Sequence, residues 1–306
     1  MGGASGGGDG PTEWWQPVVL GGLAGSMAEM TAMPWLVVRT RLMVQGVGPG
    51  KGLTVYAGLF DCVRTMYRQE GVRSFYKGGL LNAISTPPAR GMYMAGVEVS
   101  KATIGGGTAS KDFAAGAMAQ LISSLAYVPR DVVIERCAID GQLTTQHGSA
   151  SSSMNVLRTI WRQEGAAGFY RAYIPHQFVW IPYNGMFFAV LGRLIEEEKA
   201  RGIDTSLYGV GVCNTASAAA VSAWATTPID VIKTRCQVQG ANPELFAFKG
   251  PLDCAVQLLK NEGPMALFSG ASGRMAYLVP NMALFIPLYD LLKSTANARK
   301  AEAAAE

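Results

Sequence analysis

Residues 228–235 read PIDVIKTR, and the same pattern occurs twice more, as PWLVVRTR at 34–41 and as PRDVVIER at 129–136. The three copies begin 95 and 99 positions apart. Each proline closes an apolar stretch of helical character, and a proline in such a stretch kinks the helix or ends it. A pattern that returns at a nearly constant period indicates a repeat architecture.

A second string follows each copy of the first. It reads EGVRSFYKG from Glu70, EGAAGFYRA from Glu164 and EGPMALFSG from Glu262, so its copies lie 94 and 98 positions apart, in step with the prolines. Two linked strings that recur three times in register are not expected by chance. The sequence therefore predicts three repeats over 14–104, 105–200 and 201–297, with a disordered segment at 1–13 and a tail at 298–306.

The composition favours a lipid environment. Hydrophobic residues make up 49% of the chain and charged residues only 16%, below the roughly 25% that is usual in soluble domains. The mean hydropathy is a modest +0.17, and charges interrupt every long apolar stretch. Membrane-spanning helices in this chain must therefore be polar on one face.

Charge and cysteine usage exclude two classes of protein. The net charge is +4, but the basic residues are dispersed, which argues against a nucleic-acid-binding stripe. The five cysteines contain no CxxC pair, which argues against a disulfide framework and a metal site. We expect no metal and no cofactor.

The local patterns predict an all-α membrane protein with two long helices in each repeat. These helices are expected at 14–44, 77–104, 108–139, 171–200, 205–239 and 269–297. A polar segment with helical spacing lies between the two helices of each repeat, for example Leu59, Val63, Met66 and Tyr67 in the first. Such spacing is typical of an amphipathic helix at a membrane surface.

The two strings resemble the signatures of the mitochondrial carrier family, P-x-[DE]-x-x-[KR]-x-[RQ] followed by [DE]-G-x-x-x-x-[FWY]-[KR]-G. The resemblance covers about 14–297. It implies six tilted transmembrane helices around a central cavity, with pseudo-three-fold symmetry and a short matrix-side helix in each repeat. It also implies a monomer that moves a small metabolite across the mitochondrial inner membrane; a plastid or peroxisomal membrane is an open alternative.

The resemblance implies a matrix gate made of ion pairs. The acidic residue two positions after each proline pairs with the basic residue five positions after another, which joins Asp131 to Lys233 and Asp230 to Arg39. The third pair is apolar, because it consists of Leu36 and Ile134. Losing both charges together costs little, whereas losing one leaves a stranded charge. We expect Leu36 and Ile134 to touch; the alternative is that the first repeat is simply degenerate.

On the opposite side, the family places [FY]-[DE]-x-x-[KR] on the second helix of each repeat. The third repeat keeps the pattern as Tyr289, Asp290 and Lys293, and the first keeps Glu98 and Lys101. The resemblance therefore implies a cytoplasmic gate in which Asp290 pairs with Lys101. With two ion pairs on the matrix side and one opposite, we expect the cytoplasm-open state to be the better populated.

Lipid sites are implied by the second string. The runs Tyr76-Lys77-Gly78 and Tyr170-Arg171 resemble the family's cardiolipin sites, where backbone N–H groups at a helix N-terminus meet a lipid phosphate. Interfacial aromatic residues beside snorkelling cations are the alternative.

Substrate contacts in the family come from the middle of the second helices. The corresponding candidates here are Ser85, Val179, Trp180, Asn184 and Leu278. None of them is charged, although a desolvated anion needs fixed positive charges. This argues against nucleotides and against di- or tricarboxylates as substrates.

Two ionisable residues lie deep in the predicted helices. Glu29 stands seven positions before Leu36, and Arg90 eleven before Lys101, so both face inward. A charge within a membrane helix is a functional candidate: Glu29 would hold an ammonium group and Arg90 a carboxylate. The alternative is a structural pair between the first two helices.

Some details resemble the branch of the family associated with branched-chain amino acids. They are the run RTRLMVQG from Arg39, Tyr56 with Phe60 and Asp61, and WIP from Trp180. Two other functions, an adaptor or receptor and an enzyme, would leave different features in the sequence. A transport-inactive adaptor or receptor would have a broken gate, but here the lost gate partners are mostly lost in pairs. An enzyme lacks support, because the only histidines are His147 and His176, the latter interpreted as structural.

Overall fold

The computed structural model describes residues 15–46, 54–104, 109–140, 142, 153–203, 208–241 and 246–305. Its long helices are α1 (Trp15–Val44), α3 (Gly79–Ile104), α4 (Ala109–Ile139), α6 (Tyr173–Ala200), α7 (Tyr208–Val238) and α9 (Ala271–Ala305). Shorter helices are α2 (Leu59–Glu70), α5 (Ser153–Tyr170) and α8 (Pro251–Asn261), with 3-10 turns η1 (Val72–Tyr76), η2 (Gln239–Ala241) and η3 (Pro264–Phe268). The predicted all-α fold with three helix pairs is confirmed.

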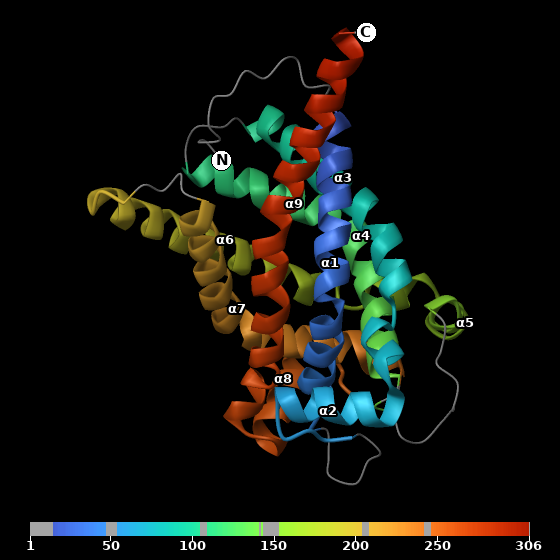
Figure 1. Ribbon diagram of the computed structural model, residues 1–306. Helices are drawn as coiled ribbons and strands as arrows, with labels where there is room; N and C mark the ends of the chain where they lie inside the picture. The colour runs from blue at the N-terminus through green and yellow to red at the C-terminus, as the bar shows by residue number, and fades with distance from the viewer. Residues whose placement is uncertain are drawn as a thin grey trace.

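The six long helices form a closed ring. Contacts join α1 to α3, α3 to α4, α4 to α6, α6 to α7, α7 to α9, and α9 back to α1. Figure 1 shows α1 and α9 running side by side along the bundle, α6 strongly inclined to them, and α2 with α8 at the lower end. Each long helix has 26 residues or more, so at 1.5 Å per residue each is long enough to cross the roughly 30 Å core of a bilayer.

Each proline of the first string lies inside a long helix: Pro34 in α1, Pro129 in α4 and Pro228 in α7. We call α1, α4 and α7 the motif helices. The helix bounds agree with the predicted ones to within three residues, except at the end of the chain, where a tail was expected from 298 and α9 instead continues to Ala305. Its last residues are rich in alanine, lysine and glutamate, which have high helix propensity.

Among the described residues, two helical stretches are long and apolar enough by composition to cross a membrane, Tyr173–Ala200 and Pro264–Ala298. The sequence predicts six. The difference has a physical cause, because the motif helices and α3 carry charged residues among their apolar ones. In α1 alone, Glu29, Arg39 and Arg41 are all buried in the bundle. Hydropathy alone therefore underestimates helices whose polar side chains face a protein interior.

Three equivalent ion pairs attach the short helices to the motif helices. We call them the arginine braces: Arg41 with Glu70, Arg136 with Glu164, and Arg235 with Glu262. In each, the two terminal guanidinium nitrogens donate to the two carboxylate oxygens, the fork geometry that favours arginine over lysine.

Each brace also caps the end of another motif helix. The Nε of Arg41 donates to the carbonyl of Ala138 at 2.9 Å. Its equivalents, Arg136 and Arg235, donate to the carbonyls of Gln237 at 3.1 Å and Met43 at 3.0 Å. These carbonyls belong to the last turns of α4, α7 and α1, where the backbone oxygens have no partner in their own helix. The cation also complements the negative end of the helix dipole.

The glycine after each brace glutamate explains why the second string begins with Glu-Gly. Gly71, Gly165 and Gly263 have φ of 76°, 65° and 83°. This left-handed region is readily open only to glycine. The chain can therefore turn sharply just after the glutamate, which leaves the carboxylate against the motif helix.

The braces predict a loss of stability in acid. Burial raises the pKa of Glu70, but the hydrogen bonds from Arg41 and Lys77 outweigh it and hold this pKa below its ordinary value of 4.5. The same balance, with Arg136, lowers the pKa of Glu164. A depressed carboxylate pKa contributes stability that is complete above the ordinary value and is lost as the pH falls through the folded-state value.

We therefore expect the unfolding temperature in detergent to fall as the pH drops below about 4.5, and Glu164→Gln to weaken this dependence. Glu197, which lies on the exposed surface of α6 near Arg201, supplies the control, since Glu197→Gln should leave the pH profile unchanged. Identical acid profiles for wild type and Glu164→Gln would contradict the prediction.

Candidate functional site

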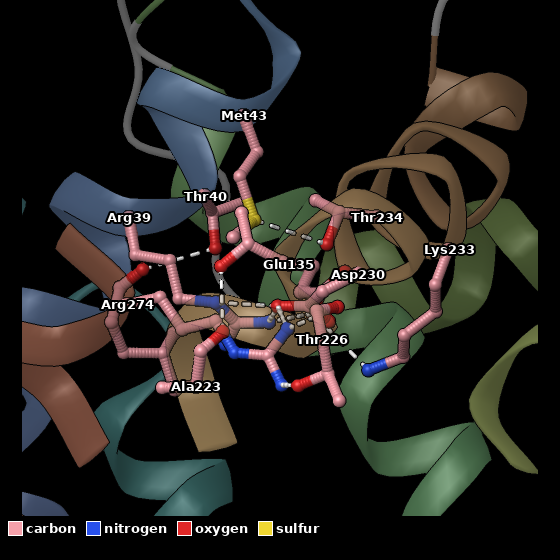
Figure 2. A network of polar contacts seen from close by, with 12 residues as sticks. Arg39, Thr40, Met43, Glu135, Ala223, Thr226, Asp230, Lys233, Thr234 and Arg274 are labelled. Carbon is pink, nitrogen blue, oxygen red and sulfur yellow. Dashed lines mark hydrogen bonds and ion pairs between the residues drawn. The ribbon is translucent and has the colours of Figure 1, made fainter. Parts of the chain in front are cut away.

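Two ion pairs join the motif helices inside the ring. Arg39 of α1 donates to one carboxylate oxygen of Asp230 on α7, from Nε at 3.1 Å and from Nη2 at 2.6 Å. Lys233 of α7 lies 3.5 Å from Asp131 of α4. Figure 2 shows Arg39, Asp230 and Lys233 converging between the helices. The structure thus brings together both charged pairs that the first string predicts.

Asp230 is shared by two arginines. Nη1 of Arg274, on α9, lies 3.0 Å from the oxygen that also accepts from Arg39. Arg274 donates in addition to the carbonyl of Thr226 at 3.2 Å and to its hydroxyl at 2.9 Å. Asp230 is 1% exposed, so these two guanidinium groups stabilise its negative charge in place of water, and Asp230 in turn stabilises their positive charges.

Asp131 is also surrounded by more than one basic group. Nε of Arg130 lies 3.6 Å from one of its oxygens, and Nδ1 of the buried His176 lies 3.7 Å from the other. His176 stands on α6 and stacks obliquely with Trp180, at 6.1 Å between ring centres. The structure therefore places His176 at the edge of the gate residues, next to the Asp131–Lys233 pair.

The third expected pair is apolar and buried. Leu36 and Ile134 belong to one hydrophobic cluster between the helices, together with Met33, Ala138 and Tyr183. At the level of Leu36 and Ile134, apolar side chains thus fill the seam between α1 and α4, where the equivalent positions of the other two seams form ion pairs. Direct contact between Leu36 and Ile134 stays a prediction.

A second charged group surrounds Glu29 on α1. Its carboxylate accepts a hydrogen bond from the hydroxyl of Thr86 at 2.8 Å and one from Nη2 of Arg130 at 2.8 Å. Arg90 is the more distant partner, with Nη2 at 3.8 Å and its guanidinium 4.4 Å from the centre of the Phe285 ring. Glu29 is therefore held from both α3 and α4.

Several N–H groups of this cluster lack a hydrogen-bond partner among the described residues. They are Nε and Nη1 of Arg130 and Nε of Arg90, and the Arg130 side chain is only 6% exposed. Buried donors without partners are rare in folded proteins. Such groups mark a place where water or an anionic ligand completes the hydrogen bonding.

The uncharged substrate candidates occupy different environments. Trp180 and Leu278 pack in the cluster that contains Leu36 and Ile134. Val179 is fully buried on α6. Asn184 and Ser85 are half-buried, and the Ser85 hydroxyl donates to the carbonyl of Leu81 in its own helix at 2.6 Å.

Sequence reasoning missed three charged residues of these clusters, Arg130, Glu135 and Arg274. The first two stand in the quoted string PRDVVIER, and charges inside a spanning helix are rare enough to deserve notice. Arg274 lies four positions before Leu278, one turn away on the same face of α9. Each occurs in one repeat only, so the search for recurring positions passed over them.

The cytoplasmic gate falls largely outside the described part of the chain. Glu98 and Lys101 belong to α3 and Asp290 to α9, but the structure does not describe the side chains of these three residues. Lys293 is half-buried on α9. The predicted pairing of Asp290 with Lys101 stays a prediction.

The basic residues of the lipid-site runs lie beside the arginine braces. Lys77 Nζ is 2.9 Å from Glu70 and 3.8 Å from Asp140, and Arg171 Nη1 is 3.3 Å from Glu164. Their aromatic neighbours are exposed, Tyr76 at 46% and Tyr170 at 43%. Gly78, with φ of 82°, directly precedes the first turn of α3.

Comparison with known proteins agrees with this geometry. The family model described as mitochondrial carrier protein matches residues 10–108, 105–196 and 208–300. Mitochondrial substrate carrier family protein E of Dictyostelium discoideum is 31% identical over 294 residues, which cover 90% of this chain and 94% of that protein. Solute carrier family 25 member 44 of Mus musculus is 29% identical, with 87% and 86% covered.

A third relative is named for its activity. The electrogenic aspartate/glutamate antiporter SLC25A12 of Homo sapiens is 28% identical over 282 residues, which cover 90% of this chain and 40% of that longer protein. The family model accounts for all three repeats, and the ring of six helices with paired charges between the motif helices fits it. The chain belongs to the mitochondrial carrier family.

Proposed function

We propose that this chain transports a small neutral amino acid by alternating access, with branched-chain amino acids as the first candidates. Membership of the mitochondrial carrier family implies transport of a metabolite across the mitochondrial inner membrane. The relatives carry the names of several different carriers, so the family leaves the substrate open. The choice of substrate therefore rests on the chemistry inside the ring.

The observation that carries the proposal is a buried carboxylate beside two arginines whose N–H groups are not all used. An α-amino acid carries an ammonium group and a carboxylate on one carbon. Glu29 would bind the ammonium group, and Arg130 with Arg90 would bind the carboxylate. Because Glu29 offsets one of the two positive charges, the cluster suits a zwitterion better than a nucleotide or a tricarboxylate.

Apolar residues nearby support a substrate with an apolar side chain. Val179 and Leu278 are buried, and Trp180 packs in the same cluster as Leu278. Ser85 and Asn184 are the polar members of the proposed site. One relative is named as an aspartate/glutamate antiporter, which supports amino acids as a class; an acidic side chain would need a further cation here.

In this mechanism the matrix gate consists of Arg39 with Asp230, Asp131 with Lys233, and Leu36 with Ile134. The cytoplasmic gate consists of Glu98, Lys101, Asp290 and Lys293. Breaking one gate while the other forms would expose the site to one side at a time. Ion pairs suit this role because their cost of desolvation nearly cancels their attraction, so they can exchange partners at small net cost.

We further propose that the protein works as a monomer and binds cardiolipin at Tyr76-Lys77-Gly78 and Tyr170-Arg171. Exposed tyrosine rings would lie among the lipid chains while the cation and the helix N-terminus meet the phosphate. The contacts of Lys77 and Arg171 with brace glutamates would make the bound lipid a stabiliser of the braces.

The test is uptake by liposomes that contain the purified chain. We expect uptake of leucine, isoleucine or valine to exceed that of glutamate, citrate and nucleotides by about tenfold or more, since one unpaired charge at a desolvated site costs more than 1.4 kcal/mol. A preference for nucleotides or tricarboxylates would overturn the assignment of the site. Absence of uptake for every compound in a folded sample would favour the alternative function, a transport-inactive adaptor or receptor.

A further inference from the structure

One position of the first string differs in charge between the repeats. The residue six positions after the proline is Thr40 in the first repeat, Glu135 in the second and Thr234 in the third. Thr40 donates to the carbonyl of Leu36 in its own helix at 3.0 Å, and Thr234 lies 3.7 Å from the sulfur of Met43. Only the second repeat therefore places an acid at this level of the bundle.

Glu135 lies between the two ion pairs of the proposed matrix gate. Its Oε1 is 3.7 Å from Nζ of Lys233 and 3.9 Å from Nη2 of Arg39. With its side-chain amide oriented to satisfy both groups, Gln237 donates to the same Glu135 oxygen at 3.2 Å. Glu135 is 4% exposed, so these groups replace its hydration; Figure 2 shows Glu135 together with Arg39 and Lys233.

The charges form one alternating series because Glu135 is in the middle. In order the series runs Asp131, Lys233, Glu135, Arg39, Asp230 and Arg274, with successive distances of 3.5, 3.7, 3.9, 2.6 and 3.0 Å. Three carboxylates thus alternate with three cations. Without Glu135 the series would separate into an Asp131–Lys233 pair and an Arg39–Asp230–Arg274 group that carries a net positive charge.

The location of Glu135 matches the seam that has lost its ion pair. The family pattern would join α1 to α4 through positions 36 and 134, and both are apolar here. Glu135 is the residue next to Ile134, and its ion pair with Arg39 joins α4 to α1. Its ion pair with Lys233 also joins α4 to α7.

We propose that Glu135 is a positioning residue that replaces the missing third ion pair and unites the two remaining pairs into one gate. The inference rests on the proposed transport function. Charged networks strengthen when their members polarise one another in a low-dielectric interior. The gate therefore closes all three seams with only two charged motif pairs, and Arg274 supplies a cation that balances the added negative charge of Glu135.

Hydrogen–deuterium exchange of the full chain in liposomes tests this without knowledge of the substrate. Glu135→Gln keeps the shape and the contact with Gln237 but removes the charge. We expect amide exchange in 36–44 and 132–139 to become about tenfold faster or more, because removing one charge from a buried ion-pair network strands its partners and is strongly destabilising. Exchange in 173–200, on α6, should change far less.

Two further variants distinguish a role of Glu135 as the link between the two ion pairs from a role in the net charge of the network alone. Glu135→Asp keeps the charge and should recover more than half of the lost protection. Glu135→Gln combined with Arg274→Gln removes one charge of each sign, yet it still lacks the middle of the series. Exchange should therefore remain fast in this double variant if Glu135 is a link, and it should return to the wild-type rate if only the net charge matters.

Wild-type exchange in Glu135→Gln, or full recovery in the double variant, would overturn the inference. A global loss of fold would accelerate exchange in every helix, and Glu135→Asp then remains the deciding variant. The transport proposal fails separately, through absence of uptake in the wild type. Even if the wild type takes up no compound, faster exchange in Glu135→Gln than in the wild type would still support the linking role of Glu135.

Discussion

Asp230→Ala should destabilise the protein by about 3–5 kcal/mol, the cost of removing one partner from a buried ion pair. The expected effect is large because this one carboxylate serves two guanidinium groups, at 2.6 Å from Arg39 and 3.0 Å from Arg274. Alanine would leave both cations buried without their shared counter-charge. Neither arginine can lose its proton to relieve the cost.

The protein offers its own reporter for this measurement. Cys62, Cys137 and Cys254 are buried while Cys213 is exposed, so once Cys213 has reacted, a thiol-reactive dye reports unfolding on heating in detergent. For a chain of this size we expect the midpoint to fall by roughly 10 °C. Asp61→Ala, which removes an exposed carboxylate bonded to the Ala57 amide, is the matched control and should cost about 1 kcal/mol or less.

A combined variant tests the reason given for the loss. Asp230→Ala with Arg274→Gln removes one of the two stranded cations, so part of the lost stability should return. If Asp230→Ala unfolds at the temperature of Asp61→Ala, the shared carboxylate is not the centre of the network. If the combined variant is no more stable than Asp230→Ala, stranded charge is not the cause of the loss.

Glu29→Gln should lower amino acid uptake about 100-fold or more while the fold persists. Glutamine has the same shape and can still accept from Thr86 at the position where Glu29 does so at 2.8 Å, but it cannot bind an ammonium group through charge. Removing one partner of a buried ion pair costs about 3–5 kcal/mol, which corresponds to at least this factor. Uptake of radiolabelled leucine at a fixed protein density measures the change.

A double variant distinguishes substrate binding from a structural pair. If Glu29 and Arg130 only hold each other, replacing both by glutamine should restore uptake, because removing a buried pair together is nearly neutral. If they bind the two ends of the substrate, Glu29→Gln with Arg130→Gln should be at least as inactive as either single variant. Normal uptake by Glu29→Gln alone would return both residues to a purely structural role.

The recurring part of the site could be predicted from the sequence. The spacing of the first string places Asp131, Asp230, Arg39 and Lys233 at equivalent turns of equivalent helices. The family resemblance then implies which of these turns face each other. Two pairings therefore follow from spacing combined with the family resemblance, and the structure has both.

The site residues that occur in one repeat only could not be predicted in the same way. Arg130, Glu135 and Arg274 each occur in one repeat, and periodicity says nothing about where a long side chain reaches. The sequence predicts that Glu29 and Arg90 both face inward, as substrate ligands or alternatively as a structural pair, yet Arg130 on α4 is the closer partner of Glu29. Which of several inward-facing cations lies nearest depends on helix tilt and on rotamers, and both are set by packing.

The short helices illustrate the same limit. The apolar stripe on α2 was expected to include Tyr67, but Tyr67 is 60% exposed while Cys62 and Met66 are buried. The pattern identifies an amphipathic helix, but the stripe can rotate by a residue around the axis. The brace between Glu70 and Arg41 holds the end of α2 against α1, and this contact spans two elements of the chain.

The arginine braces have a consequence for assembly. Arg41 of the first repeat needs the Ala138 carbonyl of the second, Arg136 needs Gln237 of the third, and Arg235 needs Met43 of the first. The last of these bonds cannot form before the third motif helix, α7, has been synthesised and inserted. A single repeat, despite its recognisable sequence, is therefore not an autonomous folding unit, and an incomplete chain would present unsatisfied helix ends to quality-control proteases.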